Sequence, residues 1–136
     1  MPHTADVGFR AWGSDLVDLL ETAARAMFSF EYDLDVVPQV ESTEISARGD
    51  DLESLMYAWL SELLWQHDAQ AFVFADIWAD ALEAQPGDLR VHAVASGSLL
   101  GDWFVQTGPQ VKAPTMHGLT VTPRDGGYEA TVYLDV

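Results

Sequence analysis

The sequence predicts an α+β fold in which two main helices pack on a mostly antiparallel β-sheet, within one compact domain of residues 1–136. Three observations predict this fold. Two long segments repeat apolar residues at helical spacing, shorter segments have the alternation typical of strands, and turn residues separate the later strands in pairs. A chain of 136 residues with 49% apolar content can bury one substantial core, but it is too short for two.

The first strand and the first helix are expected before residue 30. Residues 7–12 alternate between two sides with the period of a half-buried strand. After a turn at Gly13, Ser14 is expected to cap a helix that runs to about Phe30. The apolar residues of this helix form one broad face: Leu16, Leu19, Leu20, Ala23, Ala24, Met27 and Phe28.

A second strand and helix follow in the same order. Residues 41–48 are expected to form the strand, and Asp50 and Glu53 then stand at the spacing of a capping box. The buried stripe of the helix is expected to comprise Leu52, Leu55, Met56, Trp59, Leu60, Leu63 and Leu64.

The remainder of the chain predicts two hairpins. Residues 72–82 and 89–96 are separated by a Pro-Gly-Asp turn signal, and residues 119–122 and 128–134 flank an Asp-Gly-Gly signal. The sequence shows no internal repeat, linker or low-complexity tract.

The charge balance is strongly acidic. There are 22 Asp and Glu against six Lys and Arg, which gives a formal net charge of −16, and Lys112 is the only lysine. Because a field of this sign repels phosphate backbones, no direct nucleic-acid binding is expected. The acidity fits either a solvated surface or attraction for cations and basic partners.

Several classes of protein and site are excluded or disfavoured. The chain has no cysteine, no nucleophile elbow and no glycine-rich phosphate loop. No stretch approaches the roughly 18 apolar residues of a membrane span, and the start lacks a secretory signal, so a cytoplasmic location is expected. His67 and His92 stand in apolar surroundings and are expected to be core or rim histidines without a functional role.

Polar residues cluster in two segments at expected strand ends, residues 3–8 and 111–118, and again at the end of the sequence. In the last strand, alternation places Leu134 on the same face as Ala130 and Val132, so Asp135 points the other way, beside the expected terminal carboxylate.

These segments resemble the archease family across nearly the whole chain. The resemblance rests on five motifs in the same order and spacing as in the family: H-T-A-D-V-G at His3–Gly8, G-S-x-L with A-A-x-A-M-F at residues 13–28, D-L-E-x-L-x-Y-x-W-L-x-E-L-L at Asp51–Leu64, K-A-x-T-x-H at Lys112–His117, and L-D-V at Leu134–Val136.

The resemblance implies a compact α+β fold and a non-catalytic function. Archeases help an RtcB-type, GTP-dependent tRNA-splicing RNA ligase to become guanylylated and to turn over many times. The family implies a divalent ion, usually calcium, held by Asp6, Asp135 and Val136, the last through its backbone or terminal carboxylate oxygens. Four further residues are implied as partner contacts or neighbours of the ion: His3, Lys112, Thr115 and His117.

The chemistry of these residues agrees with the implied ion. Calcium takes about 6–8 oxygen ligands, and two aspartates beside a chain terminus would repel one another without a cation or proton. From the residues alone, Asp6 could instead cap a turn, and Asp135 could be a solvated end residue. Lys112 could pair with either aspartate, contact the partner complex, or extend into solvent.

Two features depart from the family pattern. Relatives usually carry a few more residues before the H-T-A-D motif, and residues 97–109 are compact where many relatives have a longer polar loop. Two other functions stay open: a general chaperone or adaptor of nucleic-acid-processing proteins, and a metal-dependent hydrolase that uses the same carboxylates to activate water. The sequence determines neither the oligomeric state nor the identity of the metal.

Overall fold

The computed structural model describes residues 6–136, so the expected contact residue His3 lies outside the described part of the chain. The elements, in chain order, are β1 (Asp6–Gly13), α1 (Leu16–Ser29), the short 3-10 helix η1 (Leu34–Val36), β2 (Glu41–Gly49), α2 (Leu52–Ala69), β3 (Phe72–Gln85), β4 (Asp88–Leu99), β5 (Ala113–Arg124) and β6 (Gly127–Asp135). None of the helices in this range is long and apolar enough to cross a membrane.

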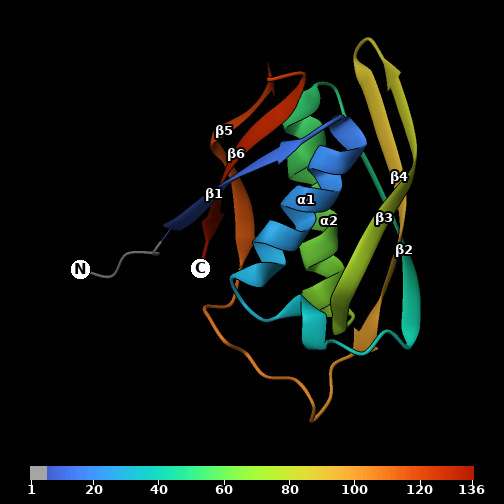
Figure 1. Ribbon diagram of the computed structural model, residues 1–136, viewed down its shortest axis with the longest axis vertical. Coiled ribbons are helices and arrows are strands. Elements are labelled where there is room, and N and C mark those ends of the chain that lie inside the picture. The colour runs from blue at the N-terminus through green and yellow to red at the C-terminus, as the bar shows by residue number, and fades with distance from the viewer. Residues whose placement is uncertain (1–5) are drawn as a thin grey trace.

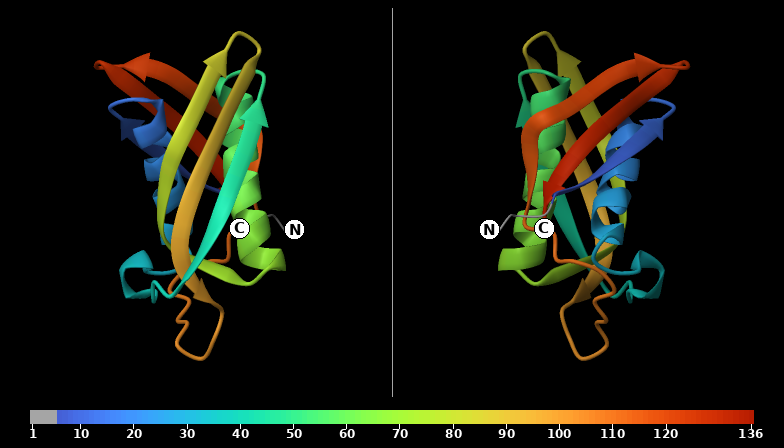
Figure 2. Two further views of the ribbon diagram at one scale, coloured as in Figure 1. Left: turned by 90° about the vertical axis from the view of Figure 1, so that its right-hand side faces the viewer. Right: turned by 90° about the vertical axis from the view of Figure 1, so that its left-hand side faces the viewer.

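The strands form two antiparallel sheets, which we call sheet A, with the order β1-β6-β5, and sheet B, with the order β2-β4-β3. Figure 1 shows α1 and α2 side by side between the two sheets, and Figure 2 shows the outer face of each sheet. The predicted α+β class, with two helices and antiparallel strands, is confirmed. Two sheets form because α1 packs on β1 and β3 while α2 packs on β2 and β5, so each helix buries apolar residues against both sheets.

One arrangement of strand, helix and hairpin occurs twice. In sheet A the unit is β1, α1 and the β5–β6 hairpin, and in sheet B it is β2, α2 and the β3–β4 hairpin. In both units the first strand pairs with the last, which also pairs with the middle one. The second unit is inserted into the first between α1 and β5, so the repeat is visible only once the strands are paired.

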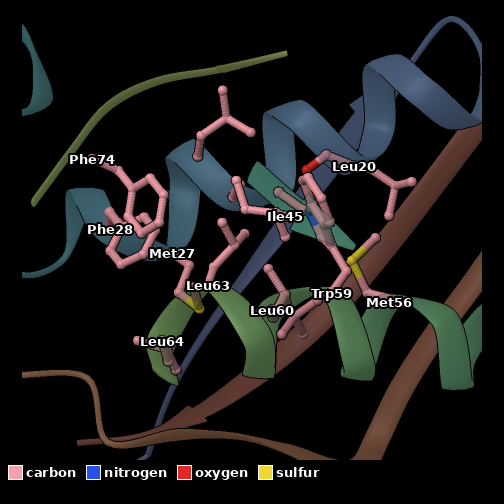
Figure 3. Close-up of a cluster of buried hydrophobic side chains, with 14 of the residues drawn as sticks. Leu20, Met27, Phe28, Ile45, Met56, Trp59, Leu60, Leu63, Leu64 and Phe74 are labelled. Carbon is pink, nitrogen blue, oxygen red and sulfur yellow. The ribbon is translucent and has the colours of Figure 1, made fainter. Parts of the chain in front are cut away.

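The core lies between the helices and the two sheets and forms one continuous cluster of buried apolar side chains. Figure 3 shows Trp59 and Leu60 of α2 against the α1 residues, with the ring of Phe28 stacked on that of Phe74. The centroids of these two rings are 5.1 Å apart. The Trp59 indole donates a 2.8 Å hydrogen bond to the Leu20 carbonyl, which satisfies a polar group in the fully buried contact between the helices.

Both helices begin at a different cap from the predicted one. Asp15, not Ser14, is the N-cap of α1, and its side chain accepts a hydrogen bond from the Asp18 amide. Asp51, not Asp50, is the N-cap of α2 and accepts from the Ser54 amide. The predictions were wrong by one residue in each helix because an aspartate at the next position caps equally well.

Helix side chains bind the backbone groups at the edges of the sheets. Glu21 of α1 accepts from the Ala79 amide of β3, and Glu53 of α2 accepts from the Val121 amide of β5. Edge strands with unpaired amides readily pair with other chains. The two glutamates therefore protect edge positions of both sheets while fixing each helix to the sheet of the other unit.

Candidate functional site

The structure places Asp6 and Asp135 directly opposite each other at the end of sheet A. They are Cα partners in the antiparallel pair of β1 and β6. Residues opposed in this way project from the same face, with Cβ atoms roughly 4.5–5.5 Å apart. The neighbouring pair, Val7 and Leu134, faces the core, so the two carboxylates lie on the outer face of the sheet. This arrangement brings both predicted side-chain ligands within reach of one ion.

Val136 follows Asp135 at this end of the sheet, and its side chain packs against the core. Because a valine side chain has no oxygen, Val136 could offer a cation only its main-chain oxygens. Lys112 lies across from it, because its amide donates a 2.8 Å hydrogen bond to the Asp135 carbonyl. The exposed Lys112 side chain forms no ion pair with any carboxylate of residues 6–136.

Thr115 lies one row further along the outer face of sheet A, opposite Tyr133. The pairing of β5 with β6 then breaks and resumes only at Thr120. His117 is exposed in this bulge, and its amide donates a 3.1 Å hydrogen bond to the Thr115 hydroxyl. Lys112 and Thr115 therefore lie in or next to the first rows of sheet A beside the aspartate pair, whereas His117 lies in the bulge beyond them.

Tyr133 is a half-exposed residue of this surface that the sequence did not reveal. Its ring lies between two glycines: a Cβ atom on Gly8 would be 2.8 Å from Cδ1, and one on Gly118 would be 2.9 Å from Cε2. Gly118 also has a φ of +76°, which other residues rarely adopt. Glycine is therefore required at positions 8 and 118, in the two polar segments 3–8 and 111–118, because a larger residue would clash with this ring.

A shallow groove of about 330 Å³ runs along sheet A beside Tyr133, lined also by Gly8, Phe9, Arg10 and Thr131. Arg10 is exposed and lies two residues along β1 from Gly8, on the same outer face. The end of sheet A thus presents two carboxylates, a phenol and an arginine on one continuous surface.

The donor atoms fit a hard cation that is bound partly by water. Carboxylate and carbonyl oxygens are the ligands that calcium prefers, and two aspartates with Val136 supply part of its shell of about 6–8 oxygens. Within residues 6–136, no group of three or more Asp, Glu and His side chains is arranged to hold a metal ion. The candidate site therefore depends on backbone oxygens and water besides the aspartate pair.

The two histidines given no role have different environments. His67 is buried, as expected, and lies 2.9 Å from both a carboxylate oxygen of Glu31 and the Phe72 carbonyl. His92 is half-buried, which fits a rim position, but its surroundings are not apolar as expected: it lies on the outer face of sheet B, between the carboxylates of Asp80 and Glu44. Alternation along β4 places His92 opposite to the buried Val91 and Ala93. Hydrogen bonds to Asp80 and Glu44 raise the pKa of His92.

Comparison with known proteins identifies the family. The sequence matches the archease protein family (MTH1598/TM1083) over residues 1–136. Protein archease of Methanopyrus kandleri is 36% identical over 134 residues, which cover 98% of this chain and 95% of that protein. Protein archease of Methanosarcina mazei is 32% identical over 139 residues, covering 100% of this chain and 93% of that protein.

Solved structures share the fold. The solution structure of Methanobacterium thermoautotrophicum protein 1598 has a TM-score of 0.82 at 31% identity and covers 100% of this chain and 96% of that one. A crystal structure from Thermotoga maritima, described as an archease and possible chaperone, has a TM-score of 0.65 at 18% identity, with 100% and 94% coverage. The family match extends over the whole chain and agrees with the five motifs and with the fold. The chain belongs to the archease family.

Proposed function

We propose that this archease is a non-catalytic activator of an RtcB-type, GTP-dependent tRNA-splicing RNA ligase, and that it promotes guanylylation and multiple turnover of the ligase. The observation that carries the proposal is the opposition of Asp6 and Asp135 at the end of sheet A. It agrees with the site that the family resemblance implies, although the two residues stand at opposite ends of the sequence.

In this proposal Asp6, Asp135 and Val136 hold a divalent ion, with calcium favoured by the all-oxygen donor set. The ion supplies a local positive charge on a strongly acidic protein and offsets the repulsion between the two carboxylates. Lys112 adds an ammonium group at the same end of the sheet, where it can meet an acidic or phosphate group of the ligase complex.

The surface around the ion is suited to contact a protein rather than RNA. With a formal net charge of −16, the chain repels phosphate backbones at long range and attracts basic surfaces. Thr115, His117 and Tyr133 provide polar and aromatic contacts beside the ion. We therefore expect the ligase, and not the RNA, to be the direct partner.

The decisive experiment is multiple-turnover RNA ligation by the cognate ligase, with GTP and a divalent metal, in the presence and absence of this protein. We expect more product per ligase and faster formation of the guanylylated ligase. The D6N variant should stimulate less, because it removes one anionic ligand with little change in size. Lack of stimulation by the wild-type protein would contradict the proposal, and nucleotide hydrolysis by this protein alone would favour a metal-dependent hydrolase.

A chaperone or adaptor function is the second candidate, and one observation favours it: the Thermotoga maritima relative is described as a possible chaperone. Several large apolar side chains are also exposed, including Trp65 and Trp78. Suppression of aggregation of several unrelated proteins, independent of Asp6 and Asp135, would support this function over specific ligase activation.

A further inference from the structure

A buried pair of ionisable residues joins the C-terminal ends of the two helices. Glu31 follows the C-cap of α1, and His67 lies in the last turn of α2. The His67 Nε2 atom is 2.9 Å from Oε2 of Glu31, and the two side chains are only 7% and 5% exposed. A polar pair at this depth costs free energy to desolvate unless its hydrogen bonds are complete.

The hydrogen-bond partners of the His67 ring determine how many protons the His67–Glu31 pair must hold. Nδ1 of His67 is 2.9 Å from the Phe72 carbonyl, which can only accept, so Nδ1 carries a hydrogen. The contact between Nε2 and Glu31 then needs a second proton, located on either the imidazole or the carboxyl group. If that proton is lost, the nitrogen lone pair faces a buried carboxylate, and the contact becomes repulsive.

Glu31 also binds the segment that leads into β5. Its carbonyl accepts from the amides of Thr107 and Gly108, at 2.8 and 3.1 Å. Its carboxylate oxygen Oε1 accepts from the amide of the fully buried Val111, at 3.4 Å. The next residue, Lys112, donates its amide to the Asp135 carbonyl at 2.8 Å. A continuous run of bonded residues therefore connects His67 to the candidate calcium site.

We propose that Glu31 and His67 are positioning residues for the calcium site: the pair fixes Val111, and through it the placement of Lys112 beside Asp135. This inference rests on the proposed function, because it takes the ion to be held by Asp6, Asp135 and Val136. Glu31 touches neither the ion nor a partner in this proposal. It acts through the backbone of the segment that pairs with the end of β6.

The surroundings favour a fixed pair over a solvated one. The rings of Phe28 and Tyr32 pack against the His67 ring, at 5.4 and 5.7 Å between centroids. The other ionisable group of α2 that lies near the pair is Asp68. Burial raises the pKa of Asp68, and the nearby Glu31 raises it further, against the opposing effect of His67. Burial also raises the pKa of the Tyr32 phenol, which keeps it neutral beside the pair.

The variants Glu31→Ala and Glu31→Gln separate the role of the side chain from that of the backbone. Alanine removes the bonds to His67 and Val111 but leaves the Glu31 carbonyl in place. Glutamine can donate its amide to a neutral His67 ring and accept from Val111, so it should preserve the position of the segment. Tyr32→Phe is the matched control, because it removes one buried hydrogen bond, to the Phe74 carbonyl, without touching Val111.

The primary measurement is amide hydrogen exchange in the metal-free protein, followed by calcium titration. In Glu31→Ala we expect the Val111 and Lys112 amides to exchange roughly tenfold faster than in Tyr32→Phe, the effect of one lost hydrogen bond. Calcium affinity should fall about tenfold, as when the support of a metal ligand is lost. Glu31→Gln should stay close to wild type in both measurements.

The two measurements also distinguish this inference from the proposed function. Equal exchange at Val111 and Lys112 in Glu31→Ala and Tyr32→Phe would overturn the positioning role, whether or not the protein binds calcium. Faster exchange with unchanged calcium affinity would show that the segment is fixed by Glu31 but not coupled to the site, and would overturn the inference as well. If Glu31→Ala does not fold, the Glu31→Gln variant gives the test. Exchange of its Val111 and Lys112 amides at the wild-type rate supports the inference, and faster exchange contradicts it. A wild-type protein that binds no calcium would refute the proposed ion site while leaving the exchange test intact.

Discussion

Asp6 and Asp135 are opposed across β1 and β6, so the structure places two like charges side by side on the outer face of sheet A. Like charges in this arrangement destabilise a strand pair unless a cation or a proton lies between them. The ion that we propose for function would therefore also stabilise the pairing of Asp6 and Val7 with Leu134 and Asp135. We therefore expect calcium binding to stabilise the strand pairing at this end of sheet A.

The first prediction concerns the aspartates themselves. Asp6→Ala or Asp135→Ala should abolish stabilisation by calcium, which for one site amounts to about 2.7 kcal/mol at a concentration of about 100 Kd. Each change also removes the repulsion, so the metal-free variants should be at least as stable as wild type. Thermal unfolding with calcium and with a chelator measures both effects. Asp50→Ala is the control, because Asp50 is exposed and is not the cap of α2. Equal calcium shifts in the Asp6 variant and wild type would contradict the assigned site.

The second prediction concerns Val136. A peptide tag attached after Val136 should weaken calcium binding and ligase stimulation, because the added residues change the surroundings and direction of the oxygens that Val136 offers. A tag of equal length before Met1 should have a smaller effect. Isothermal titration with calcium compares the two tagged proteins with the untagged one. Undiminished binding after the C-terminal extension would show that Val136 is not a ligand, and the site would then need water in its place.

The third prediction is a pH dependence of stability. Burial by itself lowers the pKa of His67, but the hydrogen bonds to Glu31 and to the Phe72 carbonyl raise it, and the net shift is upward. A raised pKa in the folded state means that the pair stabilises the protein fully below the unfolded-state pKa. This stabilisation is lost as pH rises through the folded-state pKa of His67. Chemical denaturation across neutral and alkaline pH should show this loss in wild type and a smaller one in Glu31→Gln. A steeper loss of stability with rising pH in Glu31→Gln than in wild type would contradict this prediction.

The fourth prediction tests which residue caps α1. Asp15→Ala should lower the free energy of unfolding by about 1 kcal/mol, because the Asp18 amide loses its partner. Ser14→Ala should cost less, since its hydroxyl forms only a 3.3 Å contact with Asp18 on the surface. Urea denaturation measures both values. A larger cost for Ser14→Ala would reverse the assignment of the cap.

The fifth prediction concerns the space that Gly8 leaves for Tyr133. Gly8→Ala should destabilise the protein by about 1 kcal/mol or more, because the added methyl group meets the ring at 2.8 Å. In a Tyr133→Ala background the same change should cost little. A double-mutant cycle by denaturation isolates this coupling. Additive effects of the two changes would show that the glycine is needed for another reason.

Much of the fold was determined by local sequence patterns. The apolar periodicity predicted α1 and α2 to within a few residues, and the Asp-Gly-Gly turn predicted the β5–β6 hairpin. These patterns are informative because helical spacing and strand alternation depend on neighbouring residues only. The nested repeat was missed, although the segments Gly13–Leu16 and Gly49–Leu52 share a Gly-x-Asp-Leu pattern, because four residues are too few to establish a repeat.

The candidate site could be predicted only through family motifs. Asp6 and Asp135 stand at opposite ends of the sequence, and no local pattern indicates that they pair. The sequence by itself determined the elements, the acidic charge and the family motifs. Tertiary structure alone decided that the strands divide into two sheets around the helices, that Tyr133 lies between Gly8 and Gly118, and that Glu31 meets His67. The physical reason is that strand pairing and buried hydrogen bonds join residues distant in the chain, and their partners are fixed only when the whole core packs.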